Sequence, residues 1–424
     1  MLGIKHKNKA NKIVSNTVML YIMTVGKYLL PLVTLPYLTR VLTPKYYGIT
    51  TYMTSTMTYF QVLIDFGFIY SATREASLFR ENKRKLGEIL SETIVAKLLL
   101  CIVGFFIMLI MVPFVTIMRE NFPLTVLYFL SVAVTIFIPD YIYRGIEKME
   151  IVSIRFILAR LVSTILTFIL IKSSDDLILM PVLLICGNLA AVIFSFVHLY
   201  REEDVTLVAI RWCNVIDSIK SSSVFFVATF ATTAFGATTT FLMGVRNLSA
   251  ITTAEIAFWG LAYQIICTIE MLYDPIISSI YPHMVKTKDY SIIKKALLIF
   301  MPLILLGVIV CYLLADYGMN LAGGPEYIEA APIFRILLPL LLFSFPAQLL
   351  GFPLLAPIGK EKMASISTVI SAVFHVSGLI ALIVVGKFTL INIAILRTCT
   401  NVVLLSSRVV MAKRAFSSYR RSLN

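Results

Sequence analysis

Residues 31–76 read PLVTLPYLTRVLTPKYYGITTYMTSTMTYFQVLIDFGFIYSATREA, and this stretch decides the fold class. Its apolar runs are long enough to cross a bilayer, which takes about 20 mostly apolar residues. Asp65 nevertheless lies inside one of these runs. A charge at the bilayer centre costs about 2.5–3.5 kcal/mol on insertion scales, so we expect this residue to face a wet interior. The stretch therefore indicates a membrane protein with a path for something polar.

The composition of the whole chain supports the same class. Of its 424 residues, 59% are hydrophobic and 14% are charged, whereas an ordinary soluble domain carries about 25% charged residues. We therefore expect an all-α polytopic membrane protein. The sequence lacks P-loop, GxSxG, HExxH and dinucleotide motifs and any cysteine pair with metal spacing. Enzymatic activity, ATP-driven pumping by this chain alone, a cofactor and a bound metal are accordingly not expected.

Hydropathy predicts about 12 membrane spans. A long inner loop, roughly Arg201 to Ser223, separates two six-helix lobes, residues 1–205 and 206–424, and transporters often place their site between two such halves. Asp65 and Asp274 occupy equivalent places in the two halves, which favours pseudo-symmetry. The spans are expected near residues 14–42, 46–73, 89–117, 124–143, 152–171, 177–199, 220–244, 253–280, 294–316, 329–356, 363–386 and 389–411.

The formal net charge of +14 raises the possibility of a nucleic-acid partner. Lys and Arg residues instead concentrate in alternate connections between the spans, as the positive-inside rule requires. This distribution predicts that both termini are cytoplasmic. It assigns the basic residues to topology and membrane lipids, and no nucleic-acid partner is expected.

Polar side chains concentrate in the first two spans of each lobe. They recur every three or four residues, which places each set on one face of its helix. Four such rows predict a central aqueous cavity shared by the two lobes, while the alternative is that the hydroxyls join neighbouring helices. The expected cavity residues are Thr24, Lys27, Thr34, Thr51, Thr54, Thr58, Gln61, Thr232, Thr239 and Tyr263.

Charged residues add three kinds of candidate. Lys27 can meet a phosphate as a point charge, and Asp65, Glu270 and Asp274 are candidates for a proton or sodium site. Arg40, Arg74 and Arg335 are further candidates for substrate binding, although position near a helix end can also explain the first two. For the remaining charges, Lys97 is expected to extend towards the inner surface, and Asp140 could pair with Arg144.

Residues 31–76 resemble the opening of Wzx-type O-antigen and polysaccharide repeat-unit flippases. These belong to the multidrug/oligosaccharidyl-lipid/polysaccharide exporter superfamily. Residues 323–337, which begin GGPEY, and residues 359–362, GKEK, also resemble the second half of that family. Thr43 stands where family members often carry glycine, a minor departure.

The resemblance implies two six-helix lobes around a central cavity and a location in the bacterial inner membrane. It implies movement of an undecaprenyl-pyrophosphate-linked oligosaccharide from the cytoplasmic to the periplasmic leaflet, by alternating access coupled to an ion gradient. Lys27 would be the cationic position that meets the pyrophosphate. A polysaccharide polymerase and a chain-length regulator are the implied protein partners.

Two other functions stay open. A multidrug or organic-cation antiporter of the same superfamily would need a negatively charged cavity, and the three acidic candidates favour it. A membrane-bound polysaccharide polymerase or glycosyltransferase would need a large external loop or a cytosolic catalytic domain, and the hydropathy pattern predicts neither.

Overall fold

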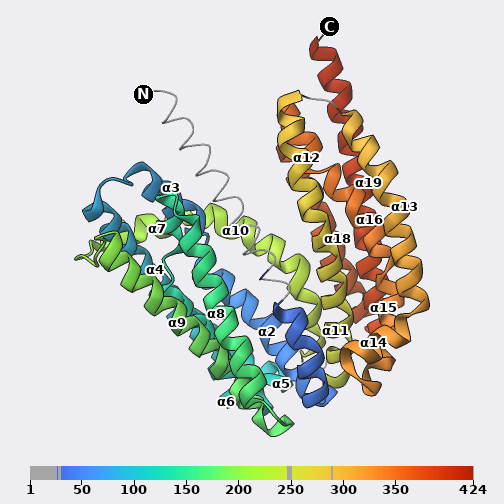
Figure 1. Ribbon diagram of the computed structural model, residues 1–424, viewed down its shortest axis with the longest axis horizontal. Helices are drawn as coiled ribbons and strands as arrows, with labels where there is room; N and C mark the ends of the chain where they lie inside the picture. The colour runs from blue at the N-terminus through green and yellow to red at the C-terminus, as the bar shows by residue number, and fades with distance from the viewer. Residues whose placement is uncertain (1–25, 27–29, 246–250, 288–289, 424) are drawn as a thin grey trace. The chain divides into compact units, whose positions relative to one another are not determined.

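The computed structural model describes Gly26 and residues 30–245, 251–287 and 290–423. The regular elements in these ranges are α-helices and short 3-10 helices, drawn in Figure 1. The chain divides into two compact units, each of which is described by itself. Of the described residues, unit 1 contains Gly26 and residues 30–37 and 52–233, and unit 2 contains residues 38–51, 234–245, 251–287 and 290–423.

Unit 1 is a bundle in which α8 packs along α9 and α3 packs on α7. The short connection between α8 and α9 favours an antiparallel pair, whereas α4, α5 and α6 lie between α3 and α7 along the chain. Its helices are α2 (Pro44–Asp65) from Tyr52 onward, α3 (Phe68–Leu78), α4 (Lys83–Met111), α5 (Thr116–Glu120), α6 (Phe122–Ala133), α7 (Asp140–Gly145), α8 (Met149–Leu170), α9 (Leu179–Glu202) and α10 (Trp212–Met243) as far as Thr233.

Unit 2 is built around its last helix, which packs on α18, α16 and α15. Its helices are α11 (Thr253–Glu270), α12 (Asp274–Thr287), α13 (Ser291–Leu313), α14 (Ala315–Gly323), α15 (Ala331–Leu337), α16 (Pro339–Leu349), α17 (Phe352–Leu355), α18 (Glu361–Val384) and α19 (Leu390–Leu423). Residues 38–51, including the first turns of α2, also belong to this unit.

The chain passes between the units inside three helical stretches, of which the first, residues 30–41, crosses at Tyr37–Leu38. Helix α2 passes from unit 2 into unit 1 at Thr51–Tyr52, and α10 passes from unit 1 into unit 2 at Thr233–Ala234. The boundaries between the two compact units thus fall inside helices, whereas the sequence predicts a boundary in the loop from Arg201 to Ser223. The lobe boundary after residue 205 stays a prediction.

Nine segments of the described chain are long and apolar enough to cross a membrane. Three predicted spans are not among them. The span near 14–42 lies largely outside the described residues, and those near 46–73 and 220–244 correspond to α2–α3 and α10. The all-α membrane fold is confirmed, while the count of 12 stays a prediction.

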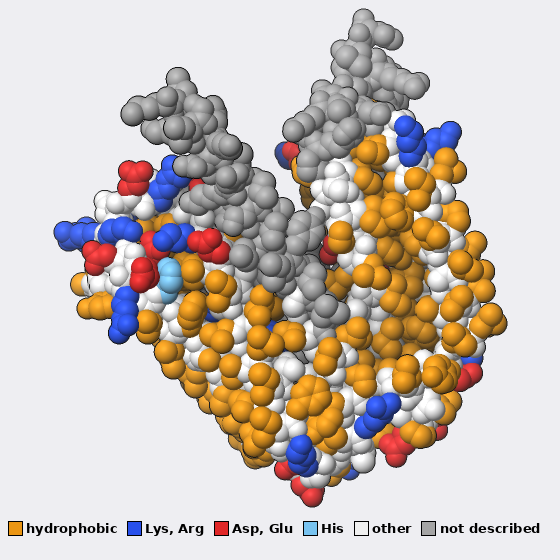
Figure 2. Space-filling model, in the orientation of Figure 1, with side chains coloured by type: hydrophobic (Ala, Val, Ile, Leu, Met, Phe, Trp, Pro, Cys, Tyr) orange, Lys and Arg blue, Asp and Glu red, His pale blue; other side chains and the backbone are white. Residues whose placement is uncertain are grey.

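Apolar side chains cover the outside of several helices. On α13, Leu298, Leu306 and Leu313 are each more than half exposed, and Ile102 and Ile110 on α4 are similarly open. Figure 2 shows hydrophobic side chains spread widely over the visible surface, with charged side chains gathered at its margins. Such surfaces are expected where a helix faces lipid.

Two of the predicted spans are interrupted beside an acidic residue. The span near 46–73 breaks at Phe66–Gly67, whose φ angles of 42° and 81° are both left-handed. The span near 253–280 breaks at the 3-10 helix η4 (Met271–Tyr273), just before Asp274 and Pro275. Left-handed residues and a proline each disrupt the regular helix. Both breaks lie beside the acidic residues that the sequence relates by pseudo-symmetry.

Candidate functional site

An ion pair lies inside unit 1 where α2 ends. The Nζ of Lys97, on α4, lies 2.8 Å from Oδ1 of Asp65. The lysine side chain is only 6% exposed, whereas the aspartate side chain is 40% exposed. The carboxylate is therefore the more accessible partner of the pair.

Polar and aromatic neighbours hold this pair in place. The amide nitrogen of Gln61 donates to Oδ2 of Asp65 over 2.7 Å and lies 3.1 Å from the hydroxyl of Thr135. Lys97 lies 5.7 Å from the centre of the Tyr141 ring, within cation–π range. Both carboxylate oxygens are thus engaged. We name Gln61, Asp65, Lys97, Thr135 and Tyr141 the unit 1 polar cluster.

The expectation that Lys97 extends towards the inner surface is wrong. Its side chain is buried because Asp65 supplies a counter-charge within hydrogen-bonding distance. The predicted pair of Asp140 with Arg144 is also wrong, since Arg155 of α8 donates to Asp140 over 2.7 Å. A short connection folds α8 back on α7, which brings Arg155 to this carboxylate.

Unit 2 has its own buried charge at Arg397 of α19. Its Nη2 donates to the Tyr263 hydroxyl over 3.0 Å, and its guanidinium lies 5.5 Å from the same ring. Trp259 stacks on Tyr263 with an interplanar angle of 11°. Glu270, two turns further along α11, interacts electrostatically with Arg397 and is within hydrogen-bonding reach of Ser344. Tyr263 and Glu270, both predicted site residues, therefore share one cluster.

A second polar network in unit 2 contains Thr239. Its hydroxyl lies 2.8 Å from Nε2 of His375, whose Nδ1 lies 2.9 Å from the hydroxyl of Thr400. All three side chains are buried. The network joins α10, α18 and α19, which is how hydroxyls hold helices together in membranes.

Part of the first stretch that carries the family resemblance, residues 38–51, lies in unit 2 close to the start of the second stretch, residues 323–337. Arg40 donates to the carbonyl of Leu321 over 2.8 Å, and Thr39 donates to the carbonyl of Ala322 over 2.9 Å. Tyr327 packs edge-on against the Tyr47 ring, with centroids 6.2 Å apart. Residues 38–51 therefore help to build the second unit.

The other predicted residues are distributed as follows. Thr54 and Thr58 are exposed on α2, Thr51 packs against Gly260, and Thr34 donates to carbonyls of its own helix. Arg335 pairs with Asp316 over 2.6 Å, and Arg74 and Asp274 are exposed.

Beside Arg74, burial raises the pKa of the Glu75 carboxyl, an effect that Lys85 opposes. Thr24, Lys27 and the side chain of Thr232 lie outside the described residues.

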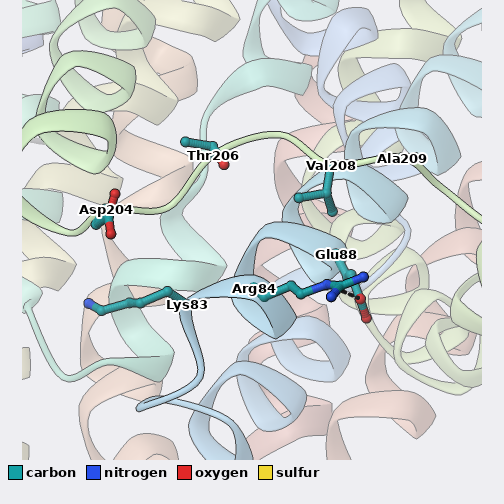
Figure 3. A pocket seen from close by; sticks show the side chains of 7 residues that line it. All are labelled: Lys83, Arg84, Glu88, Asp204, Thr206, Val208 and Ala209. Carbon is teal, nitrogen blue, oxygen red and sulfur yellow. Dashed lines mark ion pairs between the residues drawn. The ribbon is translucent and has the colours of Figure 1, made fainter.

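A cavity of about 490 Å³ opens where the loop before α10 crosses the start of α4. Figure 3 shows that Arg84 turns towards Glu88, and their ion pair spans 3.8 Å. The other lining residues are Lys83, Asp204, Thr206, Val208 and Ala209. Its two basic and two acidic side chains balance, and it includes none of the predicted site residues. We therefore do not assign substrate binding to it.

Sequence reasoning missed the partners Lys97 and Arg155 and the buried residue Arg408. A signal was available for each, since all three are basic residues inside otherwise apolar helices. Within the described part of the chain, no group of three or more His, Cys, Asp or Glu side chains could hold a metal ion.

Comparison with known proteins identifies a family and relatives of similar sequence. A family model described as polysaccharide biosynthesis protein matches residues 13–288. A protein of Escherichia coli (strain K12), provisionally named an O-antigen transporter, is 24% identical over 387 residues, covering 88% of this chain and 89% of the relative.

Two solved structures share the fold. An inward-facing multidrug resistance transporter of the MATE family matches with a TM-score of 0.71 at 13% identity, over 95% of this chain and 99% of that one. The lipid II flippase MurJ, in an inward closed conformation, matches with a TM-score of 0.65 at 13% identity, over 93% of this chain and 87% of that one. Identities this low relate the folds alone.

Proposed function

Because the chain belongs to the polysaccharide biosynthesis protein family, we propose that it is a flippase for a lipid-linked oligosaccharide. It moves an undecaprenyl-pyrophosphate-linked repeat unit, of O-antigen or a similar polysaccharide, from the cytoplasmic to the periplasmic leaflet of the bacterial inner membrane. Each unpaired polar group of a glycan costs several kcal/mol in hydrocarbon, so the sugar needs a wet route. The polyprenyl tail stays in lipid, and the two lobes alternate access to the cavity between them.

The observation that carries this proposal is the ion pair of Asp65 and Lys97. Lys97 lies in a helix whose length and composition suit a membrane, and Asp65 pairs with it from the end of α2; ionised side chains inside membrane helices mark transport pathways. The lysine of this pair is buried while its carboxylate is 40% exposed, which suits a carboxylate that exchanges its partner. The relative named as an O-antigen transporter aligns over nearly the whole chain, which supports a transporter rather than an enzyme.

Ion coupling is assigned to Asp65. A proton that adds to its carboxylate neutralises it, and Lys97 then loses its charged partner. A sodium ion would compete with the lysine for the same oxygens. One charge that crosses 100 mV supplies about 2.3 kcal/mol, enough to bias a conformational equilibrium. Glu270 and Asp274 are the corresponding candidates in unit 2.

The state of the acidic residues argues against the organic-cation alternative. Asp65 is paired with Lys97, and Glu270 interacts electrostatically with Arg397. These basic neighbours reduce the net negative charge that a binding site for an organic cation would need. The remaining cationic candidate, Lys27, is assigned to the pyrophosphate, with Arg40, Arg74 and Arg335 as further contacts. The polar rows of α2, with Thr54 and Thr58 exposed, suit sugar hydroxyls.

The test is complementation of a strain that lacks its own repeat-unit flippase. Such a strain is expected to accumulate lipid-linked repeat units and to lose surface polysaccharide. This chain alone should restore the polysaccharide, while Lys27→Ala and Asp65→Asn should not, at equal amounts in the membrane. Asp217→Asn is the matched control, because this carboxylate and its partner Lys220 are both 74% exposed. Failure of the unaltered chain to clear the accumulated lipid would refute the proposal.

A further inference from the structure

A strained turn follows the ion pair directly. Asp65 is the last residue of α2, and Phe66 and Gly67 connect it to α3. Both residues adopt left-handed φ angles, 42° and 81°. Glycine adopts this conformation freely, but a phenylalanine rarely does. A bulky residue stays in such a state only where its surroundings hold it.

Helix α10 forms one of those surroundings. The ring of Phe66 stacks on Phe226 of α10, with centroids 4.5 Å apart and planes at 14°. A Cβ atom at Gly67 would lie 2.5 Å from the Cβ of Phe225, so the backbone of the turn touches the same helix. The hydroxyls of Ser71 and Ser222 lie 2.6 Å apart and extend the seam along α3.

The ion pair holds the other side of the turn. Lys97 fixes the carboxylate of Asp65. Just after the turn, Phe68 packs against Ala96, which precedes Lys97 on α4, and against Val215 of α10. Three chain segments thus meet at this turn: the end of α2, the middle of α4 and the first half of α10. Helix α10 then continues into unit 2 beyond Thr233.

We infer that the Phe66–Gly67 turn transmits the ionic state of Asp65 to helix α10, with Phe66 and Phe226 as positioning residues. This inference rests on the proposed role of Asp65 in coupling. When an ion breaks the pair with Lys97, the end of α2 loses its anchor and the strained Phe66 relaxes. Its stacked partner Phe226 moves with it, and so does the first half of α10.

The competing interpretation is that the aromatic stack only fills space. Contact alone does not establish coupling, which requires that a change at one site alter the other through the contact. The two interpretations differ in one result. If the stack only fills space, the effect of Asp65→Asn on α10 does not depend on Phe226.

Amide hydrogen exchange of the full-length protein in lipid nanodiscs tests this without any substrate. The peptides to follow cover residues 214–227 of α10. Four proteins are compared: the unaltered chain, Asp65→Asn, Phe226→Leu and the double variant. Phe226→Leu keeps an apolar side chain of similar bulk while removing the stacking. Phe105→Leu is the matched control, because it removes an aromatic pair with Phe129 in the same unit, away from the turn.

We expect Asp65→Asn to speed exchange in α10 about twofold to thirtyfold, the range of typical coupling energies. In the Phe226→Leu background this acceleration should disappear, and in the Phe105→Leu background it should persist. No response of α10 to Asp65→Asn would overturn the inference, and so would an equal response with and without Phe226. Either result would leave the flippase proposal standing, since that is tested by polysaccharide assembly.

Discussion

Two buried basic residues, one in each unit, are bound in different ways. In unit 1, Lys97 faces a carboxylate whose side chain is 40% exposed. In unit 2, Arg408 of α19 is buried and donates to the carbonyl of Ala347 over 2.6 Å and to the hydroxyls of Ser367 and Thr368. These acceptors are neutral oxygens on α16 and α18.

This difference separates a residue that can switch from one that holds the fold. A pair with an accessible carboxylate can be broken by a proton or a metal cation, because the ion competes for the same oxygens. The guanidinium of Arg408 instead donates to neutral oxygens on neighbouring helices. A proton or metal cation has no carboxylate to compete for there. Under the proposed function, the Asp65–Lys97 pair is therefore suited to coupling, and Arg408 is suited to helix packing.

The largest expected effect comes from reversing the charge of the unit 1 pair. Asp65→Lys places two ammonium groups together and should abolish polysaccharide assembly. The double variant Asp65→Lys with Lys97→Asp restores opposite charges and should recover at least about tenfold more activity than the single variant, a difference of about 1.4 kcal/mol. Complementation at matched membrane levels measures both. A double variant no better than the single one would show that the pairing itself is unimportant.

Removing Arg408 should cost stability rather than coupling. Arg408→Ala leaves the Ala347 carbonyl buried without this donor and opens space beside Gly351. We expect a loss of about 3 kcal/mol in unfolding free energy, from one unsatisfied group and one cavity. Denaturant unfolding in detergent measures it. The contrast between the units fails if this variant changes the response to an ion gradient as much as Asp65→Asn does.

Thr239→Val gives a smaller effect and tests one predicted cavity residue. The change removes the hydrogen bond to His375 while Thr400 keeps its own. A net loss of about 1 kcal/mol in unfolding free energy is expected, the usual value of such a bond. A variant of unchanged stability with impaired flipping would instead assign Thr239 to the substrate path.

The smallest effect is expected at an exposed pair. Asp217 and Lys220 lie 3.9 Å apart on α10 with both side chains 74% exposed. Solvent screens such pairs almost completely. Asp217→Asn should leave the melting temperature unchanged, and a clear decrease would mean that surface charges also stabilise this unit.

The sequence predicted what depends on local pattern. Apolar length identified an all-helical membrane protein, and helical spacing placed Gln61 and Asp65 on one face, where they hydrogen-bond. The partner of Asp65 could not be predicted, because helix spacing does not say which face of α4 packs against α2. Asp140 shows the same limit, since its partner comes from the next helix.

The breaks in the helices were only partly predictable. Gly67 inside an apolar span signals a possible interruption, but a left-handed Phe66 depends on the contacts that hold it. The placement of residues 38–51 in unit 2 also required the structure. Arg40 shows why: a basic residue at a helix end has many possible partners, and the carbonyl of Leu321 is 281 residues away.

The most direct test of the central claim is the response of flipping to an ion gradient. Labelled undecaprenyl-pyrophosphate-linked oligosaccharide is followed in proteoliposomes with and without an imposed proton or sodium gradient. We predict that one of these gradients accelerates the unaltered chain and has no effect on Asp65→Asn, while Asp217→Asn responds normally. If Asp65→Asn is accelerated to the same extent as the unaltered chain, the ion pair does not couple transport.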